Sequence, residues 1–74
     1  MASVNDFGKR LDQFIKENFK KQGEFAKAIG VRDSAVTMWI KGEREPHIRH
    51  IVEICQKYNL SLNWLMLGEG DMYI

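Results

Sequence analysis

Four side chains in the second half of the sequence are of the types that bind metal ions: His47, His50, Glu53 and Cys55. The two histidines stand three residues apart, which on a helix brings them to one face, but no second pair of ligands follows at the spacing of a zinc site. Cys55 falls on an apolar stripe, where a free thiol is normally a small core residue. The sequence also lacks a nucleophile–base set, paired catalytic carboxylates and a glycine-rich phosphate loop. We therefore expect no metal site, no cofactor and no enzymatic activity.

Residues 22–39 have the pattern of two short helices joined by a tight turn. Polar side chains on these helices could form hydrogen bonds with a partner. Such helices must approach closely, which requires a small residue where they cross and a residue that tolerates positive φ in the turn. Ala26 and Gly30 stand at these two positions. The apolar anchor positions are filled by Phe25, Ile29, Val31, Val36 and Trp39. The spacing is that of a helix-turn-helix, which we place at about residues 22–41.

The helix-turn-helix and its surroundings resemble the lambda-repressor-like (Cro/CI-type) family of phage and bacterial regulators. The resemblance covers about residues 5–70 and includes the turn KGEREP at residues 41–46. The sequence NLSLNWLMLGEG at residues 59–70 looks much like the end of the DNA-binding domain in phage CI-type repressors. The resemblance implies a compact five-helix domain in a bacterial cytoplasm that represses transcription by binding double-stranded operator DNA as a homodimer. Such a chain is either a complete small regulator or the N-terminal domain of a longer repressor with a C-terminal oligomerisation domain.

Two groups of residues would meet the DNA in this arrangement. The third helix would lie in the major groove, where side chains near its N-terminal end reach the edges of base pairs. The expected base contacts are Asp33, Ser34, Thr37 and Met38. The expected contacts to the sugar–phosphate backbone are Gln22, Arg32, Lys41 and Arg44, and Lys9, Arg10, Lys20 and Lys21 could extend this patch. Gln22 would donate its side-chain amide to a phosphate at the start of the second helix.

Asp33 departs from the neutral polar residue, often Gln, that many relatives carry at this place. A carboxylate close to phosphates is repelled, unless it accepts a hydrogen bond from the amino group of a cytosine. The alternative, which we favour, is that Asp33 caps the third helix, because Arg32 cannot. Lys21 and Gly23 also depart from the pattern, since Lys21 replaces a capping Ser or Thr and Gly23 weakens a helix. The second helix should therefore depend on packing for its order.

Five short helices must position these residues, and no segment is typical of a strand, so we predict an all-α fold in one domain, residues 1–74. Apolar residues recur at helical spacing over about residues 4–18, where Ser3 and Asp6 resemble a capping box. The second and third helices are predicted at Gln22–Ile29 and Asp33–Lys41, each followed by a glycine that favours the left-handed conformation.

The last two helices follow the 41–46 turn. Pro46 is expected in the first turn of the fourth helix, which runs to Tyr58, and Asn59 is expected in the left-handed position after it. The fifth helix is predicted at Leu62–Leu67, with Ser61 as its N-cap and Gly68 at its end.

Composition restricts the class of protein further. No apolar run approaches the roughly 18 residues of a transmembrane helix, the start has no signal-peptide layout, and one cysteine excludes an internal disulfide. The net charge is +1, but residues 9–44 hold nine basic and five acidic residues (net +4), whereas residues 45–74 hold two basic and four acidic residues (net −2). The basic half contains the helix-turn-helix and would face a negative partner. The near-neutral total predicts weak non-specific binding to DNA.

The apolar end of the fifth helix allows a second function class. Trp64 should close the core, whereas Met66, Leu67 or Met72 could meet a second copy of the chain. The same residues would also suit a protein-binding module on this scaffold, such as an antitoxin-like partner or an anti-repressor target. A protein partner predicts an apolar surface and weak salt dependence, whereas DNA binding predicts an affinity that falls steeply with salt.

Overall fold

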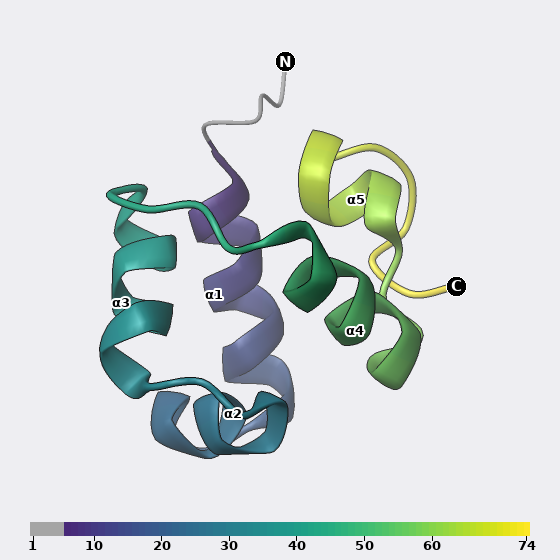
Figure 1. Ribbon diagram of the computed structural model, residues 1–74. Coiled ribbons are helices and arrows are strands. Elements are labelled where there is room, and N and C mark those ends of the chain that lie inside the picture. The colour runs from purple at the N-terminus through teal and green to yellow at the C-terminus, as the bar shows by residue number, and fades with distance from the viewer. Residues whose placement is uncertain (1–5) are drawn as a thin grey trace.

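The computed structural model describes residues 6–74, in which five α-helices are joined by short turns (Figure 1). The helices are α1 (Phe7–Asn18), α2 (Gln22–Ile29), α3 (Asp33–Lys41), α4 (Ile48–Tyr58) and α5 (Leu62–Leu67). The all-α prediction is confirmed, and α2, α3 and α5 have the predicted bounds. None of the helices in residues 6–74 has the length and apolar character needed to span a bilayer.

The start of α1 differs from the expected capping box. Asp6 is the N-cap residue itself, not a residue three positions inside the helix, and its side chain makes no capping hydrogen bond. Ser3, the other half of the expected box, lies outside the described residues. The apolar spacing that predicted this helix is confirmed from Phe7 onward, where Leu11, Phe14 and Ile15 are buried.

Helices α2 to α5 each end in the left-handed conformation, as predicted. The residues at these ends are Gly30 (φ 76°), Asn59 (φ 53°), Gly42 (φ 79°) and Gly68 (φ 72°). At Gly30 the reversal lets the N–H of Val31 donate to the carbonyl of Ala26 at 3.0 Å, which closes the end of α2 and directs the chain into α3. A Cβ added at Gly30 would have no atom within 4 Å apart from those of the glycine itself and its two chain neighbours, so the requirement for glycine there is one of backbone conformation.

Pro46 does not lie in the first turn of α4, which corrects the prediction. The helix begins two residues later, because His47 is the N-cap and its Nδ1 accepts from the Arg49 N–H at 3.1 Å. Pro46 is buried just before the helix. The predicted cap of α5 is confirmed, since Ser61 Oγ accepts from the Trp64 N–H at 3.2 Å.

Helix α1 runs through the middle of the fold, with α3 on one side and α4 and α5 on the other, and α2 crosses one end (Figure 1). The fully buried side chains come from all five helices and the α4–α5 turn: Phe14, Phe25, Leu11, Ile54, Leu60, Leu65 and Val36. Helices α1 and α3 approach each other closely at Gly8. A Cβ there would collide with the carbonyl oxygen of Ile40 and would lie 2.9 Å from that of Trp39. Gly8 thus sets how closely α3 approaches the centre of the fold.

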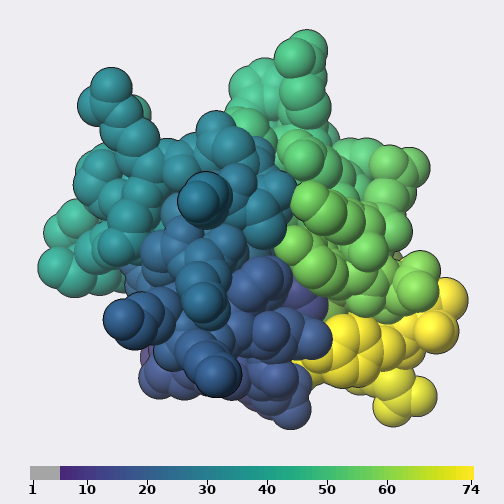
Figure 2. All heavy atoms as spheres, turned by 90° about the horizontal axis from the view of Figure 1, so that it is seen from below, coloured from purple at the N-terminus to yellow at the C-terminus, as the bar shows by residue number. Residues whose placement is uncertain are grey.

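The C-terminal residues fold back onto the domain. Tyr73 forms an isolated antiparallel bridge with Leu60, and its hydroxyl accepts from Asn18 Nδ2 at 2.7 Å. The Ser61 N–H donates to the carbonyl of Met72 at 2.7 Å. Figure 2 shows the C-terminal residues in yellow against the end of α1. This segment therefore links the end of α1 to the turn between α4 and α5.

Candidate nucleic-acid interface

Helices α2 and α3 form the predicted helix-turn-helix. The small residue at their crossing is Ala26, whose side chain is buried. The apolar anchors Phe25, Ile29, Val36 and Trp39 are all buried, and Val31 packs against this core from the turn. Neither Lys21 before α2 nor Arg32 before α3 provides a side-chain cap. The core thus fixes the angle at which α3 is presented.

A hydrogen-bonded triad joins the starts of the two helices. Gln22 Nε2, at the first residue of α2, donates to Asp33 Oδ1 at 2.7 Å and to Thr37 Oγ1 at 2.7 Å. It also lies 3.2 Å from the carbonyl oxygen of Asp33. Gln22, Asp33 and Thr37, which the sequence assigned to separate DNA contacts, are therefore linked before any DNA is bound.

Asp33 does not cap α3, which corrects the favoured prediction. The N-cap position belongs to Arg32, which has extended backbone angles, and Asp33 is the first residue inside the helix. A residue at that position already has helical φ and ψ, so its carboxylate is turned toward Gln22 instead of toward the free N–H groups of its own helix.

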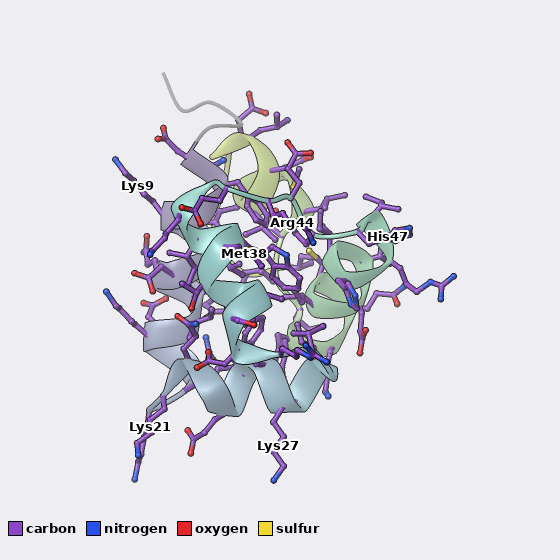
Figure 3. The ribbon with its side chains drawn as sticks, turned by 60° about the vertical axis from the view of Figure 1, so that its left-hand side comes forward. Lys9, Lys21, Lys27, Met38, Arg44 and His47 are labelled. Atoms are coloured by element: carbon purple, nitrogen blue, oxygen red, sulfur yellow. The ribbon has the colours of Figure 1, made fainter. Side chains whose placement is uncertain are left out.

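The other expected base contacts share the outer side of α3. Ser34 is exposed, whereas Thr37 and Met38 are half-buried. Figure 3 shows Met38 on α3, near the turn that carries Arg44. That turn closes against the helix, because the N–H groups of Glu43 and Arg44 both donate to the carbonyl of Met38, at 2.9 and 3.3 Å.

The cations expected at the DNA backbone divide into two groups. Arg32, Lys41 and Arg44 are exposed at the two ends of α3, where they flank the polar side chains. Lys9, Lys20 and Lys21 are also exposed, and Figure 3 shows Lys9 and Lys21 projecting away from the body of the domain.

Arg10 does not extend the basic patch, which is a second correction. Its side chain is only 8% exposed, and it donates from Nε to the carbonyl of Leu65 at 2.8 Å and from Nη2 to that of Met66 at 3.0 Å. A guanidinium at the last turn of α5 satisfies carbonyls that lack helical partners and suits the negative end of the helix dipole. The periodic pattern contains a signal for this, because Arg10 stands three residues after Phe7 and four before Phe14, on the buried side of α1.

Sequence reasoning also missed Lys57 on α4. Its Nζ donates to the carbonyl of Ala28 at 2.9 Å, in the last turn of α2. This contact gives α2 a cation at its C-terminal end and ties it to α4. A lysine sixteen residues after the helix-turn-helix carries no sequence signal for such a role.

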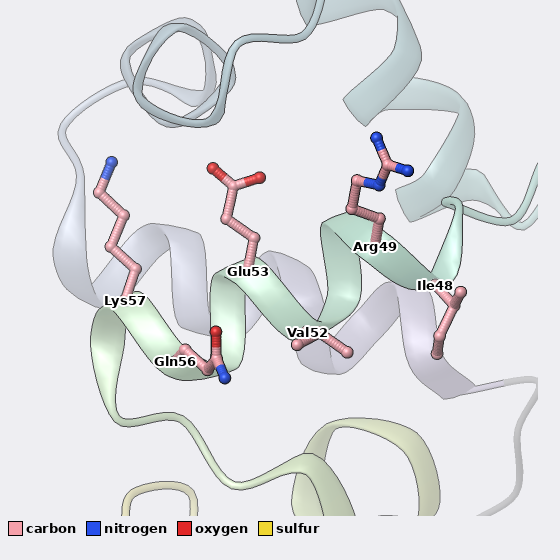
Figure 4. A pocket seen from close by; sticks show the side chains of 6 residues that line it. All are labelled: Ile48, Arg49, Val52, Glu53, Gln56 and Lys57. Atoms are coloured by element: carbon pink, nitrogen blue, oxygen red, sulfur yellow. The ribbon is translucent and has the colours of Figure 1, made fainter.

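The expected dimer residues differ in exposure. Leu67 is 44% exposed, whereas Met66 and Met72 are half-buried against the core. A second apolar surface lies on α4, where Ile48 and Val52 are exposed. Figure 4 shows these two side chains with Gln56 on one side of α4, while Arg49, Glu53 and Lys57 line the other side.

The residues first considered as metal ligands lie in separate environments. His47 caps α4, and His50 packs beside Trp39, with ring centroids 5.8 Å apart. Burial raises the pKa of the Cys55 thiol, as is typical of a core cysteine. Across residues 6–74, no three His, Cys, Asp or Glu side chains gather closely enough to hold a metal ion.

Comparison with known proteins agrees with this arrangement. Residues 15–65 match a family model described as helix-turn-helix. The chain is also similar to an uncharacterized HTH-type transcriptional regulator from Haemophilus influenzae, with 31% identity over 65 residues, which is 88% of this chain. The match covers 27% of that relative, so the chain spans about a quarter of its length. No solved structure matches the chain.

Proposed function

The chain belongs to the Cro/CI-type helix-turn-helix family of DNA-binding transcriptional regulators, and from this premise we propose that it is a phage or prophage CI-like repressor. It binds a palindromic operator as a homodimer, in the cytoplasm of a bacterial host, and its function is binding without catalysis. The observation that carries the proposal is the Gln22–Asp33–Thr37 triad, because it presents polar groups at the start of α3 between exposed cations.

In this proposal α3 lies in the major groove and supplies the sequence preference. Asp33, Ser34 and Thr37 contact base edges through their polar groups, and Met38 packs against the methyl group of a thymine. These side chains lie within the first six residues of α3, the part of a recognition helix that reaches the bases.

The flanking residues supply affinity and register. Arg32, Lys41 and Arg44 pair with phosphates on either side of the groove. Gln22 contributes differently from the sequence prediction, because its amide hydrogens are engaged by Asp33 and Thr37. We assign its phosphate contact to the backbone N–H at the start of α2, a helix end without a side-chain cap.

The dimer is proposed to form through the C-terminal part of the domain. Leu67 offers exposed apolar area there, and Met66 and Met72 are partly buried against the core. Two copies would place their α3 helices in half-sites about one helical turn apart. A C-terminal oligomerisation domain on a longer chain would strengthen this contact. The Haemophilus influenzae relative is long enough to hold a further domain, since the match covers 27% of it.

One observation favours a second candidate function, that of a protein-binding module. Ile48 and Val52 on α4 and Leu62 and Leu67 on α5 are each more than 40% exposed. A protein partner could cover these side chains, and such binding would depend weakly on salt. The two functions are compatible because these helices are separate from α3.

Selection of bound duplexes from a random double-stranded DNA pool tests the proposed function. We expect an enriched palindrome whose affinity falls steeply with salt. Lys41→Ala should weaken binding to all duplexes about equally and reduce the salt slope by about 1, whereas Ser34→Ala should change the preference between sites. If no sequence is enriched and affinity is independent of salt, the DNA-binding proposal is wrong and the protein-binding candidate gains.

A further inference from the structure

The Gln22 amide fixes the hydrogen-bonding polarity of its two partners on α3. Its nitrogen must face Asp33, because both the carboxylate and the carbonyl oxygen of that residue are acceptors. The same nitrogen then donates to Thr37 Oγ1 at 2.7 Å, so the hydroxyl acts as an acceptor in this bond. The Thr37 hydroxyl can therefore still donate its hydrogen to another group.

Asp33 and Thr37 each keep one hydrogen-bonding group that could contact a ligand. Within residues 6–74 no donor reaches Asp33 Oδ2 and no acceptor takes the Thr37 hydroxyl hydrogen. A Cβ added to Gly23 on α2 would lie 4.0 Å from Oδ2, and glycine leaves that position empty. The start of α3 thus presents a free acceptor and, one helical turn later, a free donor.

From this polarity we propose that Asp33 selects cytosine in the operator, with Oδ2 accepting from the N4 amino group, while Thr37 donates to an acceptor on the paired or neighbouring base. The inference rests on the proposed DNA-binding function. In the major groove, guanine and thymine present acceptors, which repel a carboxylate. Adenine presents an amino donor beside the N7 acceptor, whereas cytosine presents its amino donor alone. A carboxylate therefore favours cytosine over adenine, and both over the other two bases.

The triad makes the discrimination between cytosine and the other bases stronger than a freely rotating aspartate would. Gln22 holds Oδ1, so the carboxylate cannot turn away from a mismatched base without losing a 2.7 Å bond. An exposed cation at Arg32, the preceding residue, offsets the repulsion between Asp33 and nearby phosphates. Gln22 is then a positioning residue for specificity, in addition to its place at the start of α2.

The test compares selections from one random duplex pool by the whole chain and three variants. The wild-type pool should contain one cytosine per half-site that Asp33→Ala no longer selects. Asp33→Asn should also lose the cytosine preference, because Gln22 keeps the amide oxygen and the free group becomes an Nδ2 donor, which favours a base that presents an acceptor. On single duplexes we expect the wild type to discriminate by about tenfold for cytosine at this position, and Asp33→Ala by less than about twofold.

Asp71→Asn is the matched control, because it removes one negative charge from an exposed position outside α2 and α3. It should raise affinity slightly on all duplexes and leave the selected sequence unchanged. If the wild type and both Asp33 variants select the same bases, the inference is overturned while the proposed function stands. If the wild type selects no sequence, the proposed function fails and the inference fails with it.

Discussion

Gly8 and Gly23 are each the second residue of a helix, and the structure predicts opposite results for the same substitution at the two positions. At Gly8, an added methyl group would collide with the backbone of α3, with the Ile40 carbonyl carbon 2.8 Å away and the Trp39 oxygen 2.9 Å away. Backbone atoms cannot rotate aside as a flexible side chain can, so α1 and α3 must separate. At Gly23, the nearest atom is Asp33 Oδ2 at 4.0 Å, which is ordinary contact.

The magnitudes follow from two opposing contributions. Overpacking a tight contact costs about 1–3 kcal/mol, and a backbone collision belongs at the upper end of that range. Replacing glycine by alanine in a helix returns at most about 1 kcal/mol. Gly8→Ala should therefore destabilise the fold by about 2 kcal/mol, whereas Gly23→Ala should stabilise it by about 0.5–1 kcal/mol. A domain of this size has a total stability of roughly 4–11 kcal/mol, so both changes are measurable.

Urea denaturation of the two variants, followed by circular dichroism, is the appropriate assay. With a slope of about 1 kcal/mol per molar urea, the midpoint should fall by about 2 M for Gly8→Ala and rise by up to about 1 M for Gly23→Ala. An equal change in the same direction for both variants would refute the packing argument, because it would show that helix propensity alone decides the outcome.

Further predictions concern three individual side chains. Arg10→Met should destabilise the fold by about 2 kcal/mol in thermal melts, because two carbonyls of α5 lose a charged donor. The folded variant should bind DNA with unchanged affinity, whereas reduced affinity with unchanged stability would place Arg10 in the interface. Cys55 should react with iodoacetamide more slowly in the folded chain than in urea, because burial raises the pKa of its thiol. Equal rates in both states would contradict its burial. The stability that the protonated thiol contributes is present below the ordinary thiol pKa and is lost as the pH rises through the raised pKa of the folded state. Tyr73→Phe should lower the melting temperature by a few degrees, since it removes the acceptor of the Asn18 bond; an unchanged melting temperature would show that this contact adds no stability.

The sequence predicted the helices well because their signals are local. Apolar spacing and left-handed end residues such as Gly30 and Asn59 act within a few positions, and the structure confirms them. The start of α4 differs because Pro46 favours the first helical turn, whereas the N-cap is His47, whose ring nitrogen accepts a backbone bond. A histidine cap is uncommon, so the local signal favoured Pro46.

The interface was less predictable because its geometry depends on contacts between helices. The spacing identified Gln22, Asp33 and Thr37 but gave no indication that one amide holds the other two side chains. The charge of Arg10 predicts a surface position, whereas its partners are carbonyls more than fifty residues away along the sequence. Gly8 likewise acquires its role only from the path of α3.

The central claim is that α3 and its flanking turns form the DNA-binding surface. It is tested most directly by titrating the 15N-labelled chain with its selected duplex and following the backbone amides by NMR. We predict the largest shifts at Gln22, across residues 32–38 and at residues 41–44, with small shifts at Val52 and Gln56 on the far side of α4. Shifts confined to α4 and α5, with residues 32–38 unchanged, would contradict the account.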